Sequence, residues 1–176
     1  YEMSMKIIVG LGNPGKEHED TRHNAGFSAI DFLVSSFQLP ASGFDKKTNT
    51  LASKGLIRKK RVILVKPQTF MNSSGLAVKS LLNFYKSKPQ DLIIIHDDKD
   101  IPLGETRVQK NRGPAGHNGV KSIIEQLGTQ NFIRIRMGVA PDNTEDIKNT
   151  AGFVLEKFTK EEKKKFVKVL ENVTKE

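Results

Sequence analysis

Short apolar runs alternate with helix-spaced apolar stripes along this 176-residue chain. The runs of strand length are KIIVGL at residues 6–11, VILV within residues 61–66 and LIIIHD at residues 92–97. The stripes, which repeat apolar side chains every three or four positions, lie at residues 24–38, 73–86 and 120–127. Such an alternation predicts an α/β layer fold in which helices flank a sheet.

The remaining patterns predict a mixed sheet. Residues 50–57 and 61–66 are typical of two strands joined by the RKKR turn, and a hairpin-like pair interrupts the parallel crossovers. Residues 104–110 predict a polar edge strand, 133–139 a half-buried strand and 160–173 a lysine-rich helix. We therefore expect a single domain, residues 1–176, with a mixed twisted β-sheet flanked by helices and an active-site cleft at the strand carboxyl ends. The most apolar strand, at 92–97, is expected to be central.

Composition limits the chemistry and the cellular compartment expected for this chain. The absence of Cys excludes disulfides, thiolate catalysis and zinc ribbons, and indicates a reducing cytoplasm. No apolar run approaches the roughly 18 residues of a spanning helix, so no membrane segment is predicted. Residues 1–5 lack the apolar core of a secretory signal and contain two methionines, which indicates an uncertain or appended start outside the fold.

The formal net charge of +9 is unevenly distributed. Residues 142–176 contain eight Lys and eight acidic residues, so the whole surplus lies in residues 1–141. A basic surplus attracts polyanions through phosphate contacts and counterion release, which makes nucleic acid the first partner to consider. A solvated lysine surface is the simpler alternative.

Polar side chains follow the predicted strands. Asn13 and His23 come after the first strand, Asn72 follows the strand at 61–66, and Asp97 ends the strand at 92–97. Because the crevice of an open α/β sheet lies beyond the carboxyl ends of its strands, Asn13, Asn72 and Asp97 are predicted to lie along one rim. Asn118, in GHNG, opens the following helix.

These residue types suit acyl chemistry. An imidazole, with a reference pKa of roughly 6.5, can take a proton from water at neutral pH, and a carboxylate on its other nitrogen fixes the tautomer. His23 and Asp97 are the candidates. Asparagine side chains can grip a peptide backbone and donate to a developing oxyanion. No Ser or Cys elbow is evident, and Ser73 and Ser74 are interpreted as helix caps, so direct attack by water is favoured.

A dinucleotide site is a weaker interpretation. Gly10, Gly12 and Gly15 match G-x-G-x-x-G after a strand, but the charged stretch 16–20 follows instead of an apolar helix. No acidic residue ends a second strand at the required separation. The glycines are therefore interpreted as a tight turn that lets the backbone approach a ligand.

A metal site is also disfavoured. His96, Asp97, Asp98 and Asp100 could ligate a cation, but the other segments offer Asn, a poor substitute for the charge that a catalytic cation needs. We expect no metal, and we expect Asp98 and Asp100 to cap or solvate the loop before Pro102.

Six segments resemble a known family. They are GLGNPG, TRHNAGF, KPQTFMNSSG, HDDKDIPLG, GHNGVKSI and FIRIRMGVA. In this order, over nearly the whole chain, they closely resemble bacterial peptidyl-tRNA hydrolase. The resemblance implies hydrolysis of the ester that joins a peptide to tRNA, which frees the tRNA for reuse in translation. It also implies a single α/β domain, a cytoplasmic monomer, peptidyl-tRNA as partner, and no metal or cofactor.

The resemblance assigns roles residue by residue. The catalytic base falls on His23 and its supporting carboxylate on Asp97. Asn13 matches the residue that separates peptidyl from free aminoacyl substrates. Asn72 and Asn118 match residues that hold the peptide and the attacking water, and both are expected to contact tRNA.

Further tRNA contacts are implied with departures. Phe70 matches an aromatic of the groove, and Arg136 matches a basic residue that contacts the terminal phosphate. His18 stands where the family usually has Tyr, and Gln109 stands where a basic residue is expected, with Lys110 beside it. The loop at 112–114 reads Arg-Gly-Pro where Gly and Ser are usual, which leaves its shape open.

Three rival functions stay open at this point. They are a noncatalytic RNA-binding relative, a nucleotide-dependent enzyme that uses the glycine loop, and a hydrolase of another acylated polyanion. Retention of both His23 and Asp97 favours the hydrolase. The RKKR segment at 58–61 could share in RNA binding, although a solvated hairpin turn is the simpler interpretation.

Overall fold

The computed structural model of the chain describes residues 5–141 and 150–175, with the backbone alone at 150, 151 and 172–175. Most of the unusual start, residues 1–4, lies outside this range. The strands are β1 (Lys6–Gly10), β2 (Gly43–Asp45), β3 (Thr50–Ile57), β4 (Lys60–Pro67), β5 (Leu92–Pro102), β6 (Thr106–Lys110) and β7 (Ile133–Ala140). The helices are α1 (Ala25–Ser36), α2 (Ser74–Phe84), α3 (Asn118–Leu127), α4 (Thr150–Leu155) and α5 (Lys160–Lys175).

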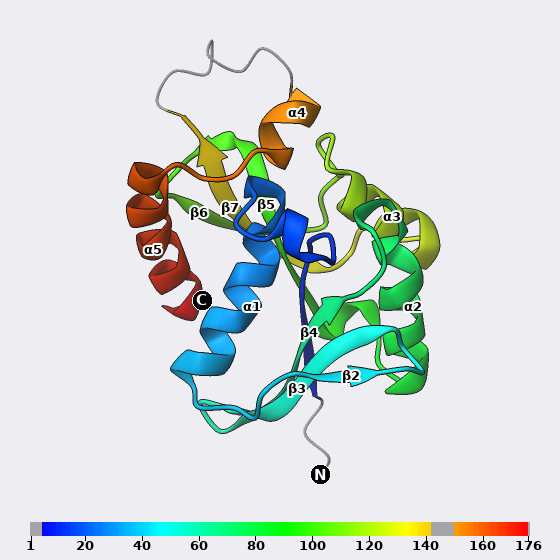
Figure 1. Cartoon of the computed structure of the whole chain (residues 1–176). Coiled ribbons are helices and arrows are strands. Elements are labelled where there is room, and N and C mark those ends of the chain that lie inside the picture. Colours follow the sequence, from blue (N-terminus) through cyan, green and yellow to red (C-terminus); the bar gives the residue numbers. More distant parts are fainter. Residues whose placement is uncertain (1–4, 142–149, 176) are drawn as a thin grey trace.

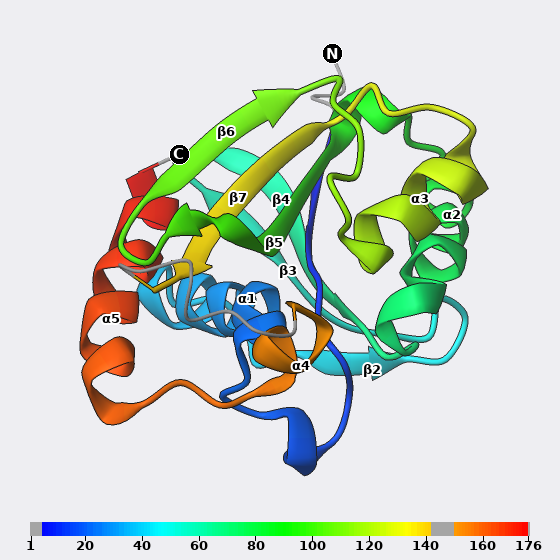
Figure 2. The ribbon, with the colours of Figure 1, turned by 90° about the horizontal axis from the view of Figure 1, so that it is seen from above.

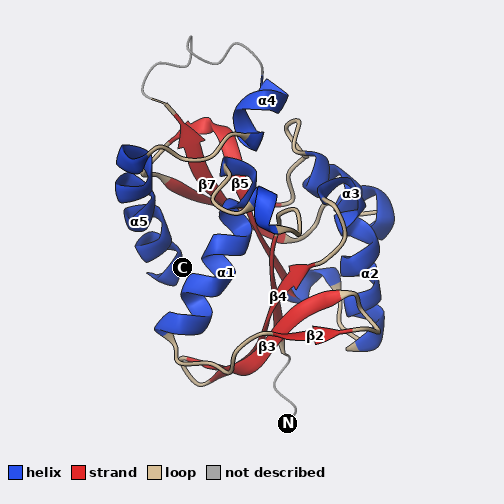
Figure 3. Ribbon diagram, in the orientation of Figure 1, coloured by secondary structure: helices blue, strands red, loops and turns tan. Residues whose placement is uncertain are grey.

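The strands, red in Figure 3, form one mixed sheet. Their order across the sheet is β2-β3-β4-β1-β5-β7-β6. β4, β1, β5 and β7 run parallel, whereas β2, β3 and β6 pair antiparallel at the two sides. The predicted mixed sheet, the β3–β4 hairpin and the polar edge strand β6 are confirmed. β5 is an interior strand as expected, but β1 occupies the middle of the order.

Helices cover both faces of the sheet (Figures 1 and 2). On one face, Val78 and Leu81 of α2 and Val120 and Ile123 of α3 pack in one core with alternate side chains of β1. On the other face, α1 and α5 pack against β4, β5 and β7. Each strand of the parallel centre is therefore buried on both sides, which explains its continuous apolar runs.

The glycines after β1 have a packing role. A Cβ at Gly10 would lie 2.1 Å from the Gly26 carbonyl oxygen, so only glycine lets α1 lie directly on the end of β1. A Cβ at Gly12 would meet the ring of Phe27 at 2.7 Å. Close helix–strand approach, and not approach to a ligand, accounts for these two positions, which corrects the interpretation made from the motif.

Strand β7 differs from the expected half-buried strand. Residues 134–140 are all buried, because the intervening positions Arg134 and Arg136 point into protein, not into solvent. The short elements β2 and α4 were not predicted. Among the described helices, none is long and apolar enough to cross a membrane.

Candidate active site

The polar residues meet where the sheet order reverses. β1 lies between β4 and β5, and its carboxyl end leads into the loop that carries Asn13 and the one-turn helix Arg22–Asn24. This one-turn helix precedes α1 and carries His23, while Asp97 comes from β5. The structure thus places both residues at the predicted rim, because the carboxyl ends of parallel strands meet there.

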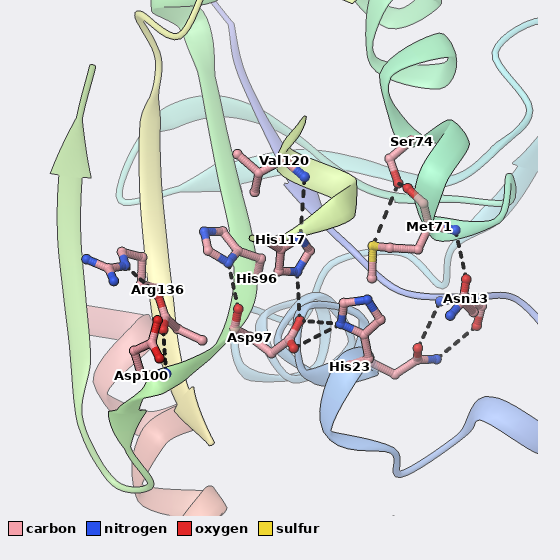
Figure 4. Close-up of polar contacts among 12 residues, drawn as sticks. Asn13, His23, Met71, Ser74, His96, Asp97, Asp100, His117, Val120 and Arg136 are labelled. Atoms are coloured by element: carbon pink, nitrogen blue, oxygen red, sulfur yellow. Dashed lines mark hydrogen bonds and ion pairs between the residues drawn. The ribbon is translucent and has the colours of Figure 1, made fainter. Parts of the chain in front are cut away.

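His23 contacts Asp97 directly (Figure 4). The Nδ1 atom of His23 lies 2.9 Å from each carboxylate oxygen of Asp97, and the two residues are 8% and 2% exposed. An ionised carboxylate only accepts hydrogen bonds, so Nδ1 carries the proton and Nε2 is left with a lone pair. This arrangement orients an imidazole for proton acceptance.

A second imidazole binds the same carboxylate. His117 places Nε2 2.9 Å from Oδ1 of Asp97, and its Nδ1 accepts a hydrogen bond from the Val120 amide at 3.3 Å. His117 is the N-cap of α3, so the start of that helix is tied to β5. The sequence pattern GHNG contains His117 but predicts no role for it, because its contact with Asp97 depends on the packing of α3.

The two imidazoles keep Asp97 ionised. Burial alone raises the pKa of this carboxyl, but electrostatic interaction with His117 and then His23, together with hydrogen bonds from both rings, lowers the pKa well below its ordinary value. The neighbouring His96 donates from Nδ1 to the Asp97 backbone carbonyl at 2.7 Å. Burial, followed by His117 and Arg134, lowers the pKa of His96 and keeps that ring neutral.

Asn13 is fixed in orientation by its neighbours. Its Oδ1 accepts the Met71 amide hydrogen at 2.7 Å, so its side chain presents the NH2 group as the remaining donor. Asn24 holds the Asn13 backbone on both sides, accepting from the amide at 2.8 Å and donating to the carbonyl at 2.9 Å. Sequence reasoning missed Asn24, although an Asn directly after His23 offered a signal.

The other predicted amides lie at the surface. Asn72 is exposed in the one-turn helix Met71–Ser73, next to the 62% exposed Phe70, and Asn118 is exposed at the first position of α3. The capping role expected for the following serines is confirmed only in position, because Ser73 is the N-cap residue of α2. Ser73 makes no side-chain cap bond, and Ser74 donates back to the Met71 carbonyl.

The predicted phosphate contact, Arg136, is 7% exposed. Its Nε donates to Asp98 at 2.7 Å and one terminal nitrogen donates to Gln109 at 2.5 Å. Asp98 is therefore a buried ion-pair partner and not a solvated loop residue, but its Oδ1 also accepts the Asp100 amide hydrogen at 2.8 Å, which confirms the capping role expected for it; Asp100 is exposed. Gln109, which stands where the family pattern has a basic residue, accepts one of the hydrogen bonds that the Arg136 guanidinium donates.

The other two expected tRNA contacts are more accessible. Lys110 is exposed at the end of β6. His18 is partly buried in the one-turn helix Lys16–His18, 3.7 Å from Glu17.

A second buried arginine holds the loop before α3. Arg134 is 1% exposed and donates to the Arg112 and Gly113 carbonyls at 2.8 and 2.6 Å. Burial, together with the charge of Arg136, lowers the pKa of Arg134 to about 10. The altered Arg-Gly-Pro loop is thus anchored through its backbone, and it leads directly to His117.

Arg22 joins the one-turn helix that carries His23 to the C-terminal part of the chain. Its guanidinium donates to the Phe153 carbonyl at 3.1 Å and to Glu162 at 2.8 Å, and it lies 4.1 Å from the centre of the Phe153 ring. The Arg22 amide also bonds the Glu156 carbonyl. Nothing in the local sequence pattern distinguished this arginine from the surface lysines.

A metal site can be assessed from the same atoms. His23, Asp97 and His117 offer ligand atoms within 4.8 Å of one another, the only such group among the described residues. A metal on His117 Nε2 would displace its proton to Nδ1, where the Val120 amide already donates. The observed pattern suits two imidazoles donating to one carboxylate better than it suits metal ligation.

A pocket of about 560 Å³ adjoins Asn13. Its wall includes Asn24, Phe27, Lys66 and Gln68. Asn13 therefore lines open space while its side-chain oxygen is held by Met71.

The model of the family described as peptidyl-tRNA hydrolase matches residues 7–176. The chain belongs to this family. It is 51% identical over 158 residues to the peptidyl-tRNA hydrolase of Mycoplasma mycoides, covering 90% of this chain and 83% of that protein. It is 46% identical over 169 residues to that of Aquifex aeolicus, covering 96% and 85%.

A solved structure of peptidyl-tRNA hydrolase from Acinetobacter baumannii matches with a TM-score of 0.88 at 32% identity, covering 99% of this chain and 88% of that one. The family and the fold predicted from the sequence are confirmed. As a member of the peptidyl-tRNA hydrolase family, the chain is a hydrolase of the ester bond of peptidyl-tRNA.

Proposed function

We propose that His23 is the general base of this hydrolase and that Asp97 orients it. The observation that carries the proposal is the contact of His23 Nδ1 with both Asp97 oxygens, which leaves Nε2 as the proton acceptor. Water attacks the ester carbonyl carbon as Nε2 takes its proton, and the negative charge of Asp97 stabilises the resulting imidazolium. Collapse of the tetrahedral intermediate breaks the bond to the ribose oxygen, which receives that proton.

Neutral amides serve the acyl group in this proposal. Asn13 presents a fixed NH2 donor beside the reacting pair, which suits a carbonyl of the peptide and thereby favours peptidyl over free aminoacyl substrates. The exposed Asn72 and Asn118 contact the peptide, the attacking water and the tRNA end. Because an ester has a better leaving group than an amide, one base and neutral donors suffice without a metal.

Phosphates of tRNA are bound by basic residues at the edge of the sheet. Lys110 is exposed and can move to a phosphate, and His18 and Phe70 offer rings for stacking. Arg136 keeps its ion pair with Asp98 and contributes its remaining donors to the terminal phosphate. We propose that the protein acts as a cytoplasmic monomer. Light scattering of the purified chain checks its oligomeric state.

Release of an N-blocked amino acid from tRNA tests the proposal. His23→Ala should reduce kcat by about a thousandfold, as expected for loss of the general base. Binding of uncharged tRNA should stay within about twofold, because the substitution leaves the basic residues in place. Normal turnover by His23→Ala would exclude His23 as the base. Full inhibition by a chelator would instead indicate a metal-dependent reaction.

A further inference from the structure

The turn between β3 and β4 has an unusual backbone for its residues. β3 ends at Ile57 and β4 begins at Lys60, and these two residues pair directly. The two connecting residues, Arg58 and Lys59, have φ of 49° and 68°. Two-residue hairpin turns with both central positions left-handed favour Asn-Gly, because side chains with a bulky Cβ substituent are strained there.

This turn therefore bears charge at a cost in stability. A left-handed backbone strains any residue other than Gly, Asn or Asp. The chain nevertheless has Arg58 and Lys59 at these positions, followed by Lys60 and Arg61, and all four side chains are exposed. Backbone preference does not explain this choice of residues, which leaves four adjacent positive charges at the end of the hairpin.

The tip of this hairpin, residues 58–61, lies at the opposite end of the sheet from the active site. β4 runs parallel to β1, so its first residue, Lys60, is at the end remote from the rim that holds Asp97. Eight residues of β4 at about 3.3 Å each place the tip roughly 25 Å from that rim. Figure 1 shows α5 beside α1, running from the active-site end of the molecule toward the end that carries the tip. Its Lys164 and Lys168 are exposed and add positive charge between these two ends.

We propose that the tip at residues 58–61 binds backbone phosphates of the tRNA body, distant from the acylated end. The inference rests on the proposed function, because a tRNA whose 3′ end is at His23 extends well beyond 25 Å. Four adjacent cations without an exposed aromatic among them suit phosphates, which are bound without reading of bases. This second contact would increase affinity for whole tRNA and leave the chemical step unchanged.

The double variant Arg58→Asn/Lys59→Gly tests the tip with its backbone preserved. Asn-Gly is the preferred pair for this turn, so we expect the melting temperature to rise. For full-length N-blocked aminoacyl-tRNA we expect KM to increase about fivefold with kcat unchanged. The slope of log affinity against log salt should decrease by up to about 2. For a short N-blocked aminoacyl-adenosine, which cannot reach the tip, neither KM nor kcat should change.

Lys86 supplies a matched control. It is an exposed lysine with φ of 50°, located after the last turn of α2. Lys59→Gly and Lys86→Gly each remove one positive charge and relieve one left-handed residue. We expect only Lys59→Gly to increase KM for the full-length substrate.

The outcomes separate the two proposals. An unchanged KM and salt slope in the double variant, or an equal effect of Lys86→Gly, would overturn the role of the tip while the parent chain still hydrolyses both substrates. Equal loss on the short and the long substrate would also overturn it, because the tip would then act through the active site. Failure of the parent chain to hydrolyse either substrate would instead refute the proposed function.

Discussion

Replacing Asp97 by Asn probes the central contact of the site with little change in volume. The substitution removes the negative charge that accepts hydrogen bonds from His23 and His117 at 2.9 Å. The new side chain has one acceptor oxygen and one NH2 group, so at least one imidazole must face a donor or change its tautomer. Ring orientation and charge stabilisation are therefore lost together.

The magnitude follows from the separation of the charges. When His23 accepts a proton, its positive charge, spread over the ring, is centred about 4 Å from the carboxylate, and at an effective dielectric constant of 20 the attraction is roughly 4 kcal/mol. Loss of this term in the transition state corresponds to a decrease in kcat of about a thousandfold. KM should change little, because the interaction forms fully only once the proton is transferred.

Single-turnover release from N-blocked aminoacyl-tRNA measures this decrease directly. Asp100→Asn is the matched control, since it makes the same chemical change at an exposed position three residues along the chain and should leave kcat unchanged. Circular dichroism confirms that each variant is folded. If kcat of Asp97→Asn were within tenfold of the parent, the electrostatic role of this carboxylate would be refuted.

Three further predictions follow from the same contacts. His117→Ala removes one of the two ring donors to Asp97; kcat should decrease about tenfold with KM unchanged in the same assay. Arg22→Met leaves Glu162 without its ion-pair partner, and urea titration should show a loss of about 1–3 kcal/mol in the free energy of unfolding. Folding lowers the pKa of Asp97, so its ionised form stabilises the protein above about pH 4 and this contribution is lost on further acidification. The difference in unfolding free energy between the parent and Asp97→Asn should therefore narrow below about pH 4.

Measured free energies of unfolding can contradict the prediction for Arg22→Met and the prediction for the pH dependence of the Asp97 contribution. An unfolding free energy of Arg22→Met equal to that of the parent would mean that the contacts with the C-terminal segment contribute nothing. A gap between the parent and Asp97→Asn that widens in acid would mean that folding raises, and does not lower, the pKa of Asp97.

The sequence predicted the parallel centre of the sheet because local patterns determine it. β1, β4 and β5 are apolar on both faces, and strands of that kind are recognisable from composition alone. The same rule failed for β7, since alternation of polar and apolar residues was taken as alternation between solvent and core. Arg134 and Arg136 are buried because partners distant in the sequence, two loop carbonyls and Asp98, satisfy them.

The active site, like the sheet, was predictable only where local patterns determine the structure. Strand ends located Asn13 and Asp97, because the position of a crevice follows from topology. The supporting contacts were not predictable, since each joins elements whose separation depends on the packed core. Asn24 binds the backbone eleven residues earlier, and Arg22 binds residues more than 130 positions later. No pattern within a window of one element contains these pairs.

Three imidazoles surround Asp97, and their hydrogen bonds decide which one can be the base. His96 is buried, donates to the Asp97 carbonyl and has its pKa lowered by burial, so it does not take up a proton at neutral pH. His117 uses both nitrogens, one on Asp97 and one on the Val120 amide, so protonation would break the cap of α3. Among the described residues, none bonds the Nε2 atom of His23. Proton uptake there would add a positive charge next to an existing negative one and break no contact among the described residues, which supports the proposal that His23, and not His96 or His117, is the base.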